Sequence, residues 1–146
     1  MFVAGLGTSG TLMGTGRFLK EQNPDIKVVA IEPPQGERVE GLRNLGDGYI
    51  PPVFDMWNGM QLLDGKSIVR PRESIEWTRR LTREAGIFCG LSAGGAMAGA
   101  VKVASRLDHG VIVFVVADGG WKYLSTGAWT MNLDEAERNA AKIIYF

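Results

Sequence analysis

The chain has 146 residues, 45% hydrophobic and 22% charged, which is the balance of one folded domain. Sixteen Lys and Arg residues offset sixteen Asp and Glu residues, and a net charge of zero disfavours a nucleic-acid partner. A single cysteine excludes an internal disulfide, and a single histidine excludes a His-pair metal site. We therefore expect residues 1–146 to form one cytoplasmic domain, with no signal peptide and no membrane span.

Apolar runs and helical periodicity alternate along the chain. The apolar runs predict strands at Phe2–Leu6, Lys27–Glu32, Ser67–Val69, Ile87–Cys89 and Val111–Ala117. The periodic segments predict helices at Thr11–Asn23, Arg72–Ala85, Ala96–Leu107 and Asn132–Lys142. The segment Gln35–Asp64 is rich in glycine and proline, which indicates a long structured loop region with up to one short helix.

This alternation predicts an α/β fold with a mostly parallel sheet and helices on both faces, in three αβα layers. Val111–Ala117 is an almost unbroken run dominated by β-branched residues, which is typical of a central strand buried on both faces. In such a sheet the functional turns lie at the carboxyl ends of the strands.

The segment between the first strand and the first helix carries the strongest functional signal. It reads Gly5-Leu6-Gly7-Thr8-Ser9-Gly10-Thr11. Glycines let the backbone approach a ligand closely, and the free N–H groups of the first helical turn favour an anion. The hydroxyls of Thr8, Ser9 and Thr11 add donors. The segment predicts a phosphate-binding site, and the alternative is a tight turn that binds nothing.

The same segment fits a dinucleotide fingerprint. Its glycines follow the pattern Gly5-x-Gly7-x-x-Gly10, and Glu32 lies about twenty residues further on, at the end of the next predicted strand. The enrichment in Thr and Ser favours a small cup around one phosphate instead. From the residues alone, both interpretations stay open.

A second glycine-rich turn, Gly90–Gly95, joins a predicted strand to a predicted helix and contains Ser92. Ser92 would face the same edge of the sheet and could bind a ring nitrogen of a ligand, or it could cap the helix. Arg43 could reach an anionic substrate group or be a solvated surface residue. We expect Cys89, at a predicted strand end, to be an inert buried thiol.

Three blocks of sequence, in this order and spacing, carry a family resemblance. They are Gly5–Leu19, Phe88–Ala96 and Lys122–Gly127. Together they resemble the cysteine synthase (O-acetylserine sulfhydrylase) family, nearest its B-type members, over almost the whole chain. These are pyridoxal-phosphate (PLP) enzymes of fold type II, and the resemblance implies the large-domain part of that fold.

The resemblance implies roles for individual residues. Gly7, Thr8, Ser9, Gly10 and Thr11 match the family loop that holds the cofactor phosphate. By the same match, Ser92 is the serine that hydrogen-bonds the pyridine nitrogen. The segment Gly48–Pro51 resembles an active-site loop near the substrate, and Arg43 just before it would favour a phosphorylated leaving group.

The family's Schiff-base lysine motif, of the Asn-Pro-x-Gly-Ser-x-Lys type, does not occur in this sequence, nor does its substrate-carboxylate loop. The chain therefore resembles the carboxyl-terminal half of a cysteine synthase, which would join O-acetylserine or O-phosphoserine to sulfide or another sulfur donor. We expect it to be inactive alone and to form a homo-oligomer or a complex with the missing amino-terminal part. The alternative is a non-catalytic domain that binds phosphate or another anion.

Overall fold

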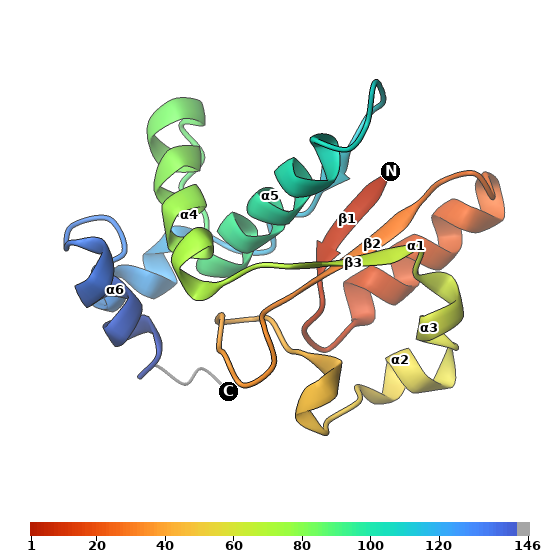
Figure 1. The fold of residues 1–146 in the computed structure, drawn as a ribbon, viewed down its shortest axis with the longest axis horizontal. Coiled ribbons are helices and arrows are strands. Elements are labelled where there is room, and N and C mark those ends of the chain that lie inside the picture. The colour runs from red at the N-terminus through yellow and green to blue at the C-terminus, as the bar shows by residue number, and fades with distance from the viewer. Residues whose placement is uncertain (143–146) are drawn as a thin grey trace.

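The computed structural model describes residues 1–142, and within them four strands form one sheet. The strands are β1 (Phe2–Gly5), β2 (Val28–Glu32), β3 (Gly65–Ile68) and β4 (Val113–Phe114). The order across the sheet is β3-β2-β1-β4, and every pairing is parallel (Figure 1). The predicted parallel α/β architecture is confirmed.

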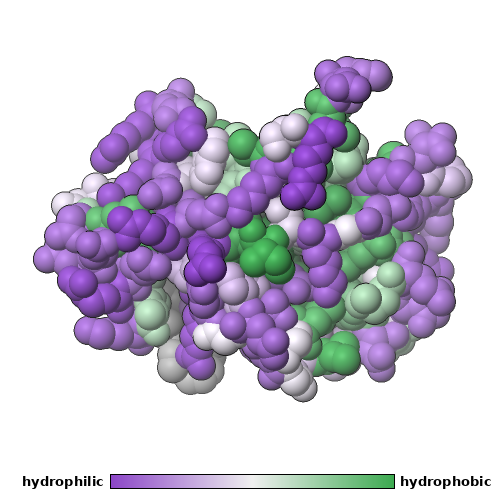
Figure 2. All heavy atoms as spheres, viewed as in Figure 1, coloured by the Kyte–Doolittle hydropathy of each residue, from purple (hydrophilic) through white to green (hydrophobic). Residues whose placement is uncertain are grey.

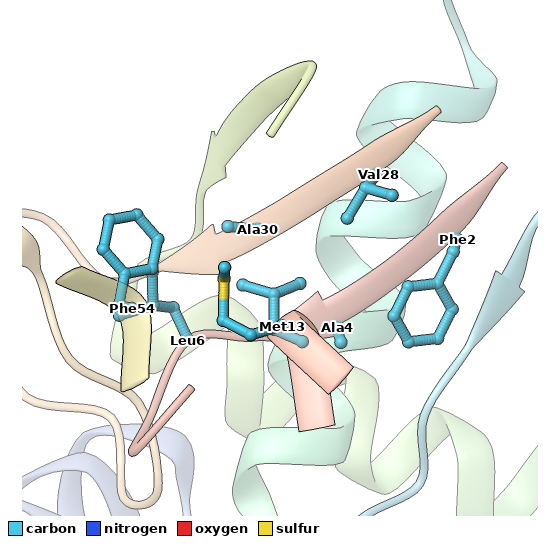
Figure 3. Close-up of a cluster of buried hydrophobic side chains, with 8 residues drawn as sticks. Phe2, Ala4, Leu6, Met13, Val28, Ala30 and Phe54 are labelled. Carbon is cyan, nitrogen blue, oxygen red and sulfur yellow. The ribbon is translucent and has the colours of Figure 1, made fainter. Parts of the chain in front are cut away.

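Alternate residues of β1 are buried on opposite faces of the sheet. On one face, Phe2 and Ala4 pack with Leu12 and Met13 of helix α1 (Gly10–Gln22) (Figure 3). On the other face, Val3 belongs to a cluster that includes residues of helix α5 (Leu91–Ala104). Because helices cover both faces, the sheet is the middle layer of three, as predicted.

The α5 side carries two further helices. Helix α4 (Pro71–Ala85) packs along α5, and helix α6 (Leu133–Ala140) packs against α4 at one end of the molecule (Figure 1). Small residues let α5 approach the sheet closely, since a Cβ added at Gly99 would overlap the side chain of Ile31. Within residues 1–142, no helix combines the length and apolar character that crossing a membrane requires.

The region Gln35–Asp64 contains more helix than predicted. It forms a 3-10 turn η1 (Leu45–Asp47) and two short helices, α2 (Pro52–Met56) and α3 (Gly59–Leu62). Helices of four and five residues are too short to display a 3.6-residue period in the sequence. The surface near these helices is partly apolar in Figure 2, and Met56 and Met60 are among its exposed residues.

Two predicted strands are wrong as stated. Ile87–Cys89 forms only an isolated antiparallel bridge between Cys89 and Gly119. The run Val111–Ala117 pairs over Val113–Phe114 alone, at the edge of the sheet, and Val113 is 57% exposed. An apolar run reports how much surface a strand can bury, but not whether a neighbouring strand is present to bury it.

The largest shift of a helix boundary is at the start of α5. Helix α5 begins at Leu91 instead of Ala96, so most of the predicted turn Gly90–Gly95 is already helical. Helix α6 starts where predicted, because the amide N–H of Glu135 donates to the side chain of its N-cap, Asn132, at 2.9 Å. A 3-10 segment η2 (Gly120–Thr126), which the sequence analysis did not predict, precedes this helix.

Candidate phosphate and cofactor site

A cup of about 190 Å³ lies at the carboxyl end of β1, where the chain turns into α1. It is lined by all five residues predicted to hold a phosphate, together with Ser92 from α5. The other lining residues come from β1, from the loop after β2 and from the segment after β4: Ala4, Gly5, Gly41, Leu42, Val115 and Ala117. The structure thus brings the two separate glycine-rich turns to one place.

The segment Gly41–Arg43 supplies another wall of the cup through Gly41 and Leu42. The amide of Arg43 donates to the carbonyl of Leu6 at 2.6 Å, which fastens this segment to the end of β1. A Cβ added at Gly7 would lie 2.6 Å from the carbonyl oxygen of Gly41. Gly7 is therefore required for this close approach, and a side chain there would displace the wall of the cup.

Ser9 has the most unusual environment in the cup. It is the N-cap of α1, its φ of 66° and ψ of −2° are left-handed, and its side chain makes no capping hydrogen bond. The residue is 3% exposed, and its Oγ has no hydrogen-bond partner. A buried hydroxyl without a partner is costly, so an acceptor brought by a ligand would satisfy it.

The electrostatics of the cup suit an anion. The first turn of α1 contains no acidic residue, and its amide groups lie at the positive end of the helix dipole. Among the lining residues there is no carboxylate to repel a phosphate. The glycine cradle, the unpartnered Ser9 hydroxyl and the helix end together fit the phosphate group of a cofactor.

Ser92, in the first turn of α5, lines the cup next to Gly41. The N-cap of that helix is Gly90, and no side chain caps it, so the alternative role of Ser92 as a helix cap is wrong. A Cβ at Gly41 would lie 3.3 Å from the Ser92 Oγ, which places the hydroxyl against the wall of the cup. From this position the hydroxyl can donate to or accept from a ring held above the cup.

A second, wider cavity of about 550 Å³ adjoins the cup and shares Gly7 and Thr8 with it. Arg43 and Tyr49 line this cavity, and the Arg43 guanidinium carbon lies 4.9 Å from the centre of the Tyr49 ring. Gly48 is not among the lining residues, but its left-handed backbone (φ 88°) ends η1 and sets the direction of Tyr49. Of the two predicted substrate residues, Arg43 thus lines the cavity beside the cup, whereas Gly48 is only next to the lining residue Tyr49 in the chain.

Sequence reasoning missed Gly41 and Leu42, which close the cup. Their only signal was a glycine inside a long loop, and Gly41 does adopt a left-handed φ of 81°. The position of this loop over the end of β1 depends on long-range contacts that no local pattern reveals.

Glu32 does not take part in the cup. Its carboxylate lies 2.9 Å from the ammonium of Lys66, and it is 2% exposed at the end of β2. A dinucleotide-binding site would need this carboxylate for a ribose. Because Lys66 already pairs with it and it lines neither cavity described above, the arrangement does not support the dinucleotide interpretation.

None of the six lysines lines the cup or the wider cavity, although all lie within the described residues 1–142. Cys89 is fully buried, as predicted, and burial raises the pKa of its thiol, which keeps it protonated. The described part of the chain also contains no cluster of His, Cys, Asp and Glu that could hold a metal.

Comparison with known proteins assigns the chain to a family. The family model described as pyridoxal-phosphate dependent enzyme matches residues 1–118, and the chain belongs to this family. Cysteine synthase B of Pseudomonas aeruginosa is 38% identical over 128 residues, and that of Escherichia coli is 37% identical. The match covers 88% of this chain but only 42% and 41% of those relatives.

Solved structures agree with these relatives. An O-acetylserine dependent cystathionine beta-synthase from Helicobacter pylori has a TM-score of 0.75 and 33% identity, over 88% of this chain and 43% of its own. An O-ureido-L-serine synthase has a TM-score of 0.76 and 32% identity, over 88% of this chain and 42% of its own. The large-domain fold of type II PLP enzymes, expected from the three sequence blocks, is confirmed.

Proposed function

We propose that this chain supplies the phosphate and ring-nitrogen contacts of PLP in an enzyme of the cysteine synthase type. The observation that carries the proposal is the Ser9 hydroxyl, buried without a partner in a glycine cup at the start of α1 that Ser92 also lines. The similarity to cysteine synthases over 88% of the chain supports the same function.

Each group in the cup has a role in this proposal. The amides of Gly7, Thr8, Gly10 and Thr11, together with the Ser9 hydroxyl, bind the phosphate, and the Ser92 hydroxyl orients the ring through its nitrogen. A neutral hydroxyl leaves that nitrogen unprotonated, whereas a carboxylate would hold a proton there. When bound, PLP supplies an electron sink of moderate strength, which suits removal of a good leaving group from an activated serine.

The substrate we propose is O-acetylserine or O-phosphoserine, with sulfide or another sulfur donor as the nucleophile. The wider cavity beside the cup is the place for it, because it adjoins the phosphate cup at Gly7 and Thr8. Arg43, stacked over Tyr49 at this cavity, would attract a phosphorylated leaving group. Gly48 sets the turn that brings Tyr49 to the same place.

Turnover requires a lysine that this chain does not place at the cup. The chain spans about 42% of the length of the curated relatives it matches. We propose that the lysine that binds the cofactor covalently lies in the part of those relatives that this chain does not cover. Alone, the chain would bind the cofactor and not turn over. We further propose that it works in a reducing cytoplasm.

The test is a titration of the purified chain with PLP, followed by borohydride reduction and mass spectrometry. We expect saturable binding with no specifically modified lysine, and about tenfold or greater weakening in Gly7→Ala, whose added methyl displaces the Gly41 carbonyl. A specifically trapped lysine would show that the anchor is present after all. Equal affinity for inorganic phosphate and PLP would instead favour the non-catalytic anion-binding domain.

We also propose that the chain self-associates through the outer edge of β4. Val111 is 76% exposed and Val113 is 57% exposed, beside an apolar groove that includes Met1, Phe2 and Ile26. An uncharged apolar edge strand pairs readily with another strand. Sedimentation velocity should show a dimer that Val113→Lys converts to a monomer, and a monomeric unsubstituted chain would contradict the proposal.

A further inference from the structure

The third sequence block, Lys122–Gly127, lies outside the cup but touches the helix that carries Ser92. Within this block, Tyr123 is 5% exposed and its hydroxyl donates to the Asp118 Oδ2 at 2.7 Å. The Lys122 ammonium lies 3.4 Å from the same oxygen. Asp118 directly follows the apolar run Val111–Ala117. Its carboxylate is thus held on one side by residues of η2.

The other side of Asp118 faces the start of α5. The amide of Gly90 donates to the Asp118 carbonyl at 3.0 Å, and the amide of Gly120 donates to the Phe88 carbonyl at 3.2 Å. A Cβ at Gly90 would overlap the Asp118 Oδ1 and would lie 2.5 Å from the Tyr123 ring. Oδ1 itself is buried and has no hydrogen-bond partner. The carboxylate is therefore packed between Tyr123 and Gly90, the N-cap of α5.

Helix α5 needs such a support, because no side chain caps its first turn. A carboxylate beside a helix N-terminus is favoured by the helix dipole, and the Asp118 carboxylate lies beside Gly90, two residues before Ser92. A group that must orient a ring has to be held within a fraction of an ångström, which takes support from neighbouring residues.

We infer that Asp118 and Tyr123 are positioning residues that fix the first turn of α5 and thereby aim Ser92 at the ring nitrogen of the cofactor. The inference rests on the proposed function, and it gives a role to the one sequence block that the cup does not use. Asp118 acts through Gly90 and Ser92, while the phosphate cup at Gly7–Thr11 is built by other elements.

The test compares two probes on the 146-residue chain by calorimetry. Inorganic phosphate occupies the cup alone, whereas 4′-deoxypyridoxine 5′-phosphate adds the ring but has no aldehyde to react with lysines. Asp118→Asn and Tyr123→Phe should each weaken the ring-bearing probe about tenfold and leave phosphate affinity within about twofold. Asp108→Asn is the matched control, since it makes the same change at an exposed aspartate and should alter neither affinity.

Amide hydrogen exchange, measured without ligand, separates this inference from the proposed function. The amides of Ala93 and Gly94, which donate to the Gly90 carbonyl, should exchange several-fold faster in both variants than in the control. Unchanged exchange, or equal losses for the two probes, would overturn the positioning role. If the unsubstituted chain binds neither probe, the proposed function is wrong, and so is the inference that Ser92 is aimed at the ring nitrogen. Faster exchange in the two variants would even then show that Asp118 supports the first turn of α5.

Discussion

Helices α1 and α5 both begin at the cup, but their first turns are held in different ways. At α1, Ser9 has left-handed backbone angles, no side chain caps the helix and the Ser9 hydroxyl has no partner. At α5, the Ser74 hydroxyl donates to the Leu91 carbonyl, and Asp118 is wedged beside Gly90. The start of α1 leaves the Ser9 hydroxyl for a ligand to satisfy, whereas the start of α5 is held in place by contacts with α4 and Asp118.

This difference matches the two tasks that we propose. A phosphate brings several acceptor oxygens, so the turn that binds it can leave its donors open and accept some backbone strain. A single hydroxyl that must face one ring atom gains nothing from openness and needs rigid support. The comparison therefore predicts that α5 tolerates change poorly and that α1 gains stability when its strain is removed.

The largest expected effect is at Gly94. A Cβ there would overlap the Thr78 hydroxyl and the Ser74 carbonyl and lie 2.7 Å from the Thr78 amide, because α4 crosses closely at this point. We expect Gly94→Ala to lower the free energy of unfolding by about 3 kcal/mol in urea titrations. Gly10→Ala, at the first position of α1 with no atom near its added methyl, is the control and should not destabilise the chain. Equal stability of the two variants would contradict the comparison.

A smaller effect is expected at Ser9. Ser9→Gly removes the left-handed strain and the hydroxyl, whereas Ser9→Ala removes the hydroxyl alone. The glycine variant should therefore exceed the alanine variant by about 1 kcal/mol in unfolding free energy. Both should bind phosphate about fivefold more weakly than the unsubstituted chain. If glycine and alanine give equal stability, the strain assigned to Ser9 is absent.

The smallest effects come from two lysine–carboxylate pairs that tie the helices to their neighbours. Lys20 of α1 lies 2.7 Å from Asp64, and Lys102 of α5 lies 2.7 Å from Glu73. Burial raises the pKa of each carboxyl, but hydrogen bonds from the lysine and from a backbone amide outweigh it, so both pKa values are below their ordinary range.

A lowered carboxyl pKa stabilises the folded chain above the unfolded-state pKa near ~4, and the contribution is lost as the pH falls through the folded-state value. We expect Asp64→Asn and Glu73→Gln each to cost about 1 kcal/mol or less at pH 7. Their stabilities should converge on that of the unsubstituted chain as the pH falls below ~4. A constant difference between pH 7 and pH 3 would mean that packing, and not charge, is responsible.

Local pattern was enough to predict the cup-forming turn and the layers of the fold. Gly7–Thr11 follows an apolar run and precedes a helical period, so both its shape and its place at the sheet edge were predictable. Gly41 also lines the cup, although it follows Gly7 by 34 residues in the chain. Only tertiary contacts hold it at this position. Val111–Ala117 was misjudged because burial of a strand depends on neighbours, and β4 has a neighbour on one side only.

The position of Cys89 makes its thiol a probe of the segment that leads into α5. It is the only cysteine of the chain, it is fully buried, and its backbone bridges Gly119 directly before α5 begins. Because residues of α4, α5 and β4 pack against it, a thiol reagent can reach it only when this packing opens. The rate of thiol modification in the unaltered protein therefore measures how often the packing around the start of the serine-bearing helix opens, and it does so without an added label.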